Sequence, residues 1–321
     1  MWAGLRTTGP ERMTISEEFR IVVDRDVRYA RFSLSPAGNL LVANTLCGSR
    51  LTLWDLDSHS KVWEYSHTDY TPSVPSFSPD GKFIADASER REDFWVFDVR
   101  TGSLVKRILV DDEFPVEGGL AADFHASCLS LDSKSLIANC CGGTACVSLD
   151  DGNYLWRDFG ERIESCCESL FLARNNCVVY ISPTDQVRVR DATTGQLINQ
   201  FGVDIQELAV SHCGNLAITL RSDGLVETFK VETGESIHRV QTTYGEWTKL
   251  AVSDGRVWLA GARYSNGDDC IVIHDAATGE TLATWPLGDL ELSHLAFHQH
   301  ERSQLVCAMD DSTIRILRIG T

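Results

Sequence analysis

The sequence lacks any long hydrophobic run, and nowhere do its apolar residues approach the roughly 18 consecutive positions that a membrane-spanning helix requires. Its opening residues, Met1 to Pro10, lack the apolar centre of a secretory signal. Basic residues are outnumbered, because 29 lysines and arginines stand against 46 aspartates and glutamates, for a formal net charge of −17. We therefore expect a soluble intracellular protein, cytoplasmic or nuclear, that binds neither membrane nor nucleic acid directly.

Signatures of common enzyme classes are also missing. The chain has no Gly-x-x-x-x-Gly-Lys phosphate loop, no Gly-x-Gly-x-x-Gly dinucleotide turn, no His-Glu-x-x-His zinc helix and no Gly-x-Ser-x-Gly nucleophile elbow. This absence favours a protein without cofactor or catalysis. A catalytic set assembled from residues far apart in the sequence would leave no such motif, so an enzyme stays open as an alternative.

The eleven cysteines show no Cys-x-x-Cys spacing, and their number is odd. Neighbouring pairs such as Cys140-Cys141 and Cys166-Cys167 rarely suit a mutual disulfide. Most alternate with apolar residues in expected strands, as small buried side chains do. We interpret them as reduced thiols used for packing rather than as metal ligands.

What the sequence does contain is a repeat. Seven short strands end in Asp or a substitute, at spacings of 39 to 50 residues: Leu51 to Asp55, Phe94 to Asp98, Thr144 to Ser148, Val187 to Asp191, Val226 to Lys230, Ile271 to Asp275 and Ile314 to Arg318. A period near 40 residues is typical of propeller blades with four strands each. The third unit is the longest, and we assign its extra length to an enlarged surface loop, Asp111 to Asp123.

Two kinds of turn accompany these strands. Tight hairpins are expected about twenty residues before them, where glycine supplies a positive φ, at Ser35 to Gly38, Ser78 to Gly81, Ser211 to Gly214 and Ser253 to Gly255. A second turn leads into the last strand of a unit, at Asp98 to Gly102, Asp191 to Gly195, Lys230 to Gly234 and Asp275 to Gly279.

These residues resemble the WD-repeat family from Asp24 to Gly320. The resemblance rests on His67-Thr68-Asp69-Tyr70 leading to Phe77-Ser78-Pro79-Asp80-Gly81, on Trp54-Asp55, and on Asp310 to Leu317. Only Trp54-Asp55 keeps the signature dipeptide, so several repeats are degenerate. The resemblance implies an all-β, seven-bladed propeller over residues 14–321. We expect residues 1–13, which precede it, to be disordered.

The final unit supplies only three strands, about Leu292 to Phe297, Gln304 to Ala308 and Thr313 to Ile319. Phe19, Ile21 and Val23 alternate as a strand would before the first unit. We expect this N-terminal strand to complete the seventh blade and to close the ring.

In WD repeats a histidine before the first strand and an aspartate between the second and third join a buried hydrogen-bond network. The resemblance assigns that structural role to His67, Asp223, Asp268 and Asp311. A histidine base with carboxylate partners is the alternative interpretation of the same residues.

The family usually binds peptides at one mouth of its central channel. Counting back from the hairpins places these residues there: Arg28, Tyr70, Asp123, Cys166, Asp204, Glu246 and Glu291, with Trp247 next in line. Four of the seven are acidic, where 46 acids in 321 residues would give about one. The hypothesis is a Lys/Arg-rich partner segment, with Tyr70 and Trp247 for cation–π contact. Acidic loops that merely solvate an acidic protein are the alternative.

The function predicted from the sequence is therefore a non-enzymatic scaffold or adaptor for other proteins. A quinoprotein-like or hydrolase propeller is the alternative, because an Asp, a turn and then Trp63 or Trp156 resemble quinoprotein repeats. A third possibility is a subunit or domain of a larger assembly, with Met13 as a second candidate start.

Overall fold

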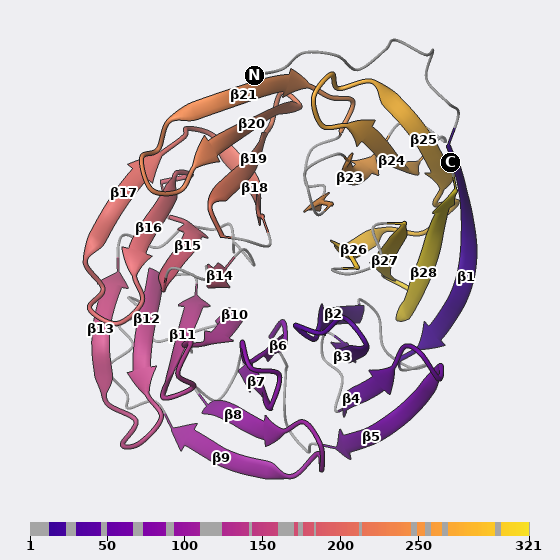
Figure 1. Ribbon diagram of the computed structural model, residues 1–321. Coiled ribbons are helices and arrows are strands. Elements are labelled where there is room, and N and C mark those ends of the chain that lie inside the picture. The colour runs from indigo at the N-terminus through magenta and orange to yellow at the C-terminus, as the bar shows by residue number, and fades with distance from the viewer. Residues whose placement is uncertain are drawn as a thin grey trace.

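Seven four-stranded antiparallel sheets stand in a ring around a common axis (Figure 1). The computed structural model describes residues 13–23, 30–45, 50–66, 73–87, 93–109, 124–140, 143–159, 170–172, 176–182, 184–211, 214–244, 249–253, 258–264, 269–298 and 303–320. All regular structure in these ranges is strand. The prediction of a seven-bladed β-propeller is confirmed.

Each blade runs from an innermost to an outermost strand. Blade 1 contains β2 (Ala30–Leu34), β3 (Leu40–Thr45), β4 (Arg50–Asp55) and β5 (Ser60–Ser66). Blade 2 contains β6 (Ser76–Phe77), β7 (Phe83–Ala87), β8 (Asp93–Asp98) and β9 (Leu104–Leu109). Blade 3 contains β10 (Phe124–Leu129), β11 (Ser135–Cys140), β12 (Gly143–Ser148) and β13 (Tyr154–Phe159). Blade 4 contains β14 (Leu170–Leu172), β15 (Cys177–Ile181), β16 (Val187–Asp191) and β17 (Leu197–Phe201). Blade 5 contains β18 (Ile205–Val210), β19 (Leu216–Arg221), β20 (Leu225–Lys230) and β21 (Ser236–Gln241). Blade 6 contains β22 (Leu250–Val252), β23 (Trp258–Arg263), β24 (Cys270–Asp275) and β25 (Thr281–Pro286).

Blade 7 joins the two ends of the chain, as the sequence predicts. It consists of β26 (Leu292–Phe297), β27 (Gln304–Met309), β28 (Thr313–Gly320) and, outermost, the N-terminal strand β1 (Thr14–Val22). In Figure 1 the indigo β1 lies along the yellow β28, and Ile21 pairs with Ile314 in the register. This pairing covers an edge of β28 that would otherwise be open.

Strand direction alternates within a blade, so the turns divide between two faces of the ring. One face carries the connections between blades and the turns between the second and third strands of each blade, and we call it the upper face. The lower face carries the turns between first and second and between third and fourth strands. The predicted lower-face turns are present where described: Gly38 and Gly81 have φ of 80° and 70°, and Gly102 donates its N–H to the Asp98 carbonyl at 2.9 Å.

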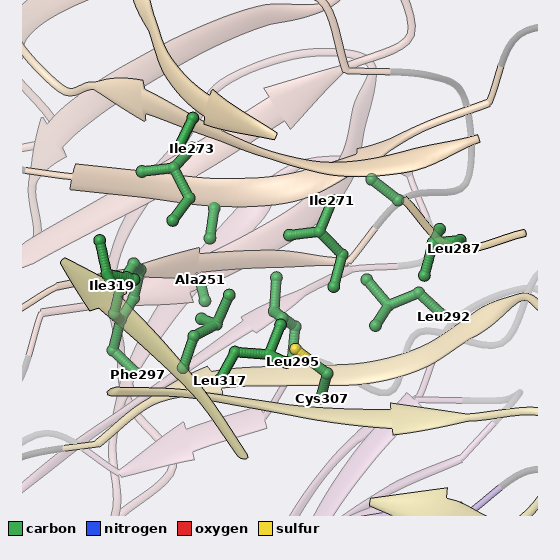
Figure 2. Close-up of a cluster of buried hydrophobic side chains, with 14 of the residues drawn as sticks. Ala251, Ile271, Ile273, Leu287, Leu292, Leu295, Phe297, Cys307, Leu317 and Ile319 are labelled. Atoms are coloured by element: carbon green, nitrogen blue, oxygen red, sulfur yellow. The ribbon is translucent and has the colours of Figure 1, made fainter. Parts of the chain in front are cut away.

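The hydrophobic core lies between neighbouring blades. Figure 2 shows the cluster between blades 6 and 7, where Ile271 and Ile273 of β24 face Leu295 of β26 and Leu317 of β28. The strands of a blade are apolar on both faces because each blade packs against two neighbours. Five described cysteines, Cys128, Cys146, Cys177, Cys270 and Cys307, are buried there as free thiols.

Outer strands reach across to the next blade. The indole of Trp63 on β5 donates Nε1–H to the Val99 carbonyl of blade 2 at 2.7 Å, and Trp156 on β13 does the same to Ala192 of blade 4 at 2.9 Å. A Cβ atom at Gly195 would overlap the Trp156 ring, so only glycine fits that turn. These two tryptophans, which suggested quinoprotein repeats, are thus inter-blade packing residues.

Each outer strand is interrupted at the same place. The register with the third strand slips by one residue near the start of the strand, which leaves one extra residue in a β-bulge. The bulge residues of blades 1 to 6 are Val62, Val105, Leu155, Ile198, Ile237 and Leu282. Bulges twist a strand edge away from flat pairing, so they protect the exposed circumference of the ring.

Several predicted features lie outside the described residues: the Asp111 to Asp123 loop, Asp254 and Gly255 of the Ser253 to Gly255 turn, Cys141, Cys166 and Cys167. Cys140 is described only in its backbone. No helix within the described ranges is both long and apolar enough to cross a membrane.

Candidate functional site

Two of the predicted rim residues are described, and both lie on the upper face. Asp204 directly precedes β18 and Glu291 directly precedes β26, and both side chains are exposed. The other predicted rim residues lie outside the described ranges: Arg28, Tyr70, Asp123, Cys166, Glu246 and Trp247. The rim as a whole therefore stays a prediction.

Asp204 belongs to a set of carboxylates between blades 4 and 5 that we call the blade 4–5 acidic group: Asp185, Asp204 and Asp223. Its backbone has φ of 55°, and Ser222 donates Oγ–H to its Oδ2 at 2.8 Å. Partial burial and the neighbouring Asp204 carboxylate together raise the pKa of Asp185 above its usual value. A cation placed between these two carboxylates would relieve that repulsion.

Glu291 belongs to a second set, the blade 6–7 acidic group: Asp269, Glu291 and Asp310. Asp310 accepts the backbone N–H of Glu291 at 3.0 Å, which fixes this connection against the last turn of blade 7. Burial raises the pKa of the neighbouring Tyr264, and the charges of the three carboxylates add to that rise. The upper face therefore carries negative potential at two separate junctions.

Asp223 and Asp311, predicted to join a buried network, both sit between the second and third strands of their blades. Asp223 accepts the Leu225 N–H at 3.1 Å, and its side chain is 54% exposed. Asp311 accepts the Thr313 N–H at 3.0 Å and pairs with Arg315 at 3.5 Å. Their described bonds are local to the turn; His67 and Asp268 lie outside the described residues.

The sequence did not point to an ion pair between the inner strands of blades 5 and 6. Lys249, just before β22, lies 3.5 Å from the Glu207 carboxylate on β18, and both side chains are largely buried. The β18 register slips between Ile205 and Glu207, and this bulge sets the position of Glu207. No pattern in the repeat distinguishes this position, so only the fold brings the two together.

A second buried polar cluster joins blades 3 and 4. Asp158 on β13 accepts hydrogen bonds from Tyr180, from Arg188 at 2.9 Å and from Arg190 at 3.0 Å. Burial alone would raise the pKa of Asp158, but the tyrosine hydroxyl and the two guanidinium groups outweigh it and lower that pKa. Its partners hold the blades together. Among the described residues, no three His, Cys, Asp or Glu side chains are arranged so that they could hold a metal ion.

Comparison with known proteins supports the architecture. No protein-family model and no curated protein sequence matches the chain. Among solved structures, the crystal structure of the Myceliophteria thermophila Cps50 (Swd1) β-propeller domain aligns with a TM-score of 0.76 and 14% identity, over 95% of this chain and 99% of that one. An identity this low establishes fold alone. By its strand order, its seven blades and this alignment, the chain is a seven-bladed β-propeller.

Proposed function

We propose that this protein is a non-enzymatic scaffold whose upper face binds a Lys/Arg-rich segment of a partner protein. The observation that carries the proposal is the pair of acidic groups at the blade 4–5 and blade 6–7 junctions. Within the described residues, Asp185, Asp204 and Glu291 have no ion-pair partner. Asp223 of the first group pairs with Arg221 at 3.3 Å. The carboxylates that lack a cation favour a cationic ligand, and the net charge of −17 adds a long-range attraction.

A rigid ring suits this role. Each blade is bound to two neighbours, and β1 closes the ring, so the upper-face loops are held at fixed separations. A preorganised surface loses little conformational entropy when it binds a flexible segment. The outer-strand tryptophans, Trp63 and Trp156, add inter-blade contacts to this frame.

The test removes one negative charge on the upper face and reverses another, without disturbing the backbone. Asp204→Asn keeps a residue that tolerates the left-handed φ of 55°, and Glu291→Lys changes an exposed position. The matched control makes the same charge change on the lower face, with Asp57→Asn and Glu232→Lys. The probe is a fluorescein-labelled peptide of alternating lysine and alanine.

We expect the upper-face double variant to weaken binding of this peptide at least tenfold at 0.1 M salt, and the lower-face control to weaken it less than twofold. Raising the salt to 0.5 M should reduce binding to the unmodified protein, because exposed charges are screened. Equal losses in the two double variants would show that net charge alone attracts the peptide, and the proposed site would then be wrong.

A further inference from the structure

The residue that follows the bulge on each outer strand faces the next blade. We call this place the junction position. Trp63 occupies it in blade 1 and Trp156 in blade 3, and each indole donates its N–H to a backbone carbonyl in the third-to-fourth-strand turn of the following blade. In blade 5 the junction position holds His238.

The junctions after blades 3 and 5 are otherwise built alike. In blade 3 the cross-strand row is Ile137, Cys146 and Trp156, and the turn opposite presents Ala192. In blade 5 the corresponding row is Ile218, Thr228 and His238, and the turn opposite presents Ala276. Alanine at the turn leaves space that Trp156 fills in blade 3. Imidazole is smaller than indole, so His238 leaves that space open.

The result is a pocket of about 440 Å³ between blades 5 and 6, on the lower outer side of the ring. Its lining is mostly aliphatic: Ile218, Val226, Ile237, Val240, Val252, Leu259, Ala276 and Ala277, with Thr228 and His238 as the polar members. This volume lies within the range of roughly 300–1,000 Å³ that is typical of ligand-binding pockets.

Two details of the lining indicate which kind of occupant the pocket favours. The Nε2 atom of His238 is buried and has no hydrogen-bond partner among the described residues. A buried polar atom without a partner is unfavourable, and a rotation of the imidazole that turns this nitrogen towards the pocket would let an occupant donate a hydrogen bond to it. Ile237, the bulge residue beside it, is 39% exposed and extends the apolar wall to the surface.

We propose that this junction pocket binds an aromatic side chain, a tryptophan or tyrosine, presented by a flexible segment of a partner protein. The chain itself shows the fit, because Trp156 fills the corresponding space against Ala192 and is only 8% exposed. An indole or phenol combines a flat apolar body with one polar hydrogen, which matches aliphatic walls and a single unpartnered imidazole nitrogen. This inference rests on the scaffold role but not on the acidic groups of the upper face.

The test uses N-acetyl-tryptophanamide as the probe and N-acetyl-leucinamide as its aliphatic counterpart. Methyl NMR spectra of protein labelled at Ile, Leu and Val report directly on the pocket through Val226, Val240, Val252 and Leu259. We expect saturable shifts of these methyl signals with the tryptophan probe, and at least fivefold weaker binding of the leucine probe.

His238→Trp fills the pocket from within, by recreating the Trp156 arrangement, and should weaken binding of the tryptophan probe at least tenfold. The matched control is Lys106→Trp, which adds an indole at the junction position of blade 2 and should leave binding unchanged. Ala277→Glu provides a second blocking variant on an exposed turn residue, should His238→Trp fold poorly.

The proposal fails if the pocket methyl signals do not shift, if the leucine probe binds equally well, or if binding survives both His238→Trp and Ala277→Glu. It also fails if sedimentation shows that His238→Trp converts a dimer into monomers, because the occupant would then be a second copy of this chain. Binding of the lysine–alanine peptide to the upper face should be unchanged in His238→Trp. The two binding sites can therefore fail separately.

Discussion

Replacing Trp156 by alanine tests the claim that outer-strand side chains hold neighbouring blades together. Its indole is 8% exposed, packs on the Gly195 turn and donates a hydrogen bond to the Ala192 carbonyl. Truncating a buried tryptophan to alanine costs about 3–5 kcal/mol of unfolding free energy, because the packing contacts are lost and a cavity remains. We expect Trp156→Ala to fall in that range.

The comparison variant is His238→Ala, which changes the same register position at the open junction. His238 is partly exposed, and its buried Nε2 has no partner within the described chain, so its removal also takes away an unsatisfied polar atom. We expect a loss of less than about 1 kcal/mol. The difference between the two losses of unfolding free energy therefore measures how much more a filled junction stabilises the ring than an open one.

The assay is urea unfolding followed by far-ultraviolet circular dichroism, which reports on the β-sheet and does not depend on the fluorescence of the removed indole. Unfolding free energies come from linear extrapolation, with the slope compared between variants to establish that the denatured state is unchanged. Losses that agree within about 0.5 kcal/mol would show that the junction after blade 3 is no better packed than the junction after blade 5, and would contradict an open pocket at the latter.

Two further predictions concern charged groups. Burial alone would raise the pKa of Asp80, but hydrogen bonds from Ser78 and Lys82 outweigh it and hold that pKa at about 2. Because this folded-state pKa lies below the unfolded value, the carboxylate stabilises the fold above pH ~4, and this stabilisation is lost as the pH falls towards 2. Asp80→Asn should therefore reduce the fall of the urea midpoint measured from pH 5 to pH 2. Asp158→Asn should lower the unfolding free energy by about 3 kcal/mol, since it leaves the largely buried guanidinium groups of Arg188 and Arg190 without their carboxylate. A loss below about 1 kcal/mol by urea titration would contradict the bridging role.

The sequence predicts the blades well because the signals are short-range. An Asp-x-x-Thr-Gly turn such as Asp98 to Gly102 carries its own hydrogen bonds: Asp98 accepts both the N–H and the hydroxyl of Thr101, and the φ of Gly102 is 68°. Alternation of apolar residues then fixes which strands lie within a blade. Ring closure followed from counting strands, and β1 pairs with β28 as expected.

The contacts between blades could not be predicted from the sequence because they join residues from different repeats. Trp156 and Ala192 are separated by 36 positions, and nothing in either repeat alone says that one fills the space beside the other. The pocket depends in the same way on His238 and Ala276. A signal was present: aligning the outer strands on their bulge residues brings Trp63, Trp156 and His238 to one position. That alignment required the register, which only the structure supplies.

A closed ring explains why one junction can stay open. In a linear array the loss of one interface divides the molecule into two parts, whereas in this propeller the strand pairing of β1 with β28 keeps blades 5 and 6 in place from the other side of the ring. The cost of leaving His238 opposite Ala276 is therefore confined to local packing and does not open the molecule. Since the upper-face carboxylates lie on loops and the pocket lies between outer strands, a partner could use both at once. Repetition supplies the rigid frame, and the junction position varies within it, from the indoles of blades 1 and 3 to the imidazole of blade 5; such variable positions are where specific binding can be built.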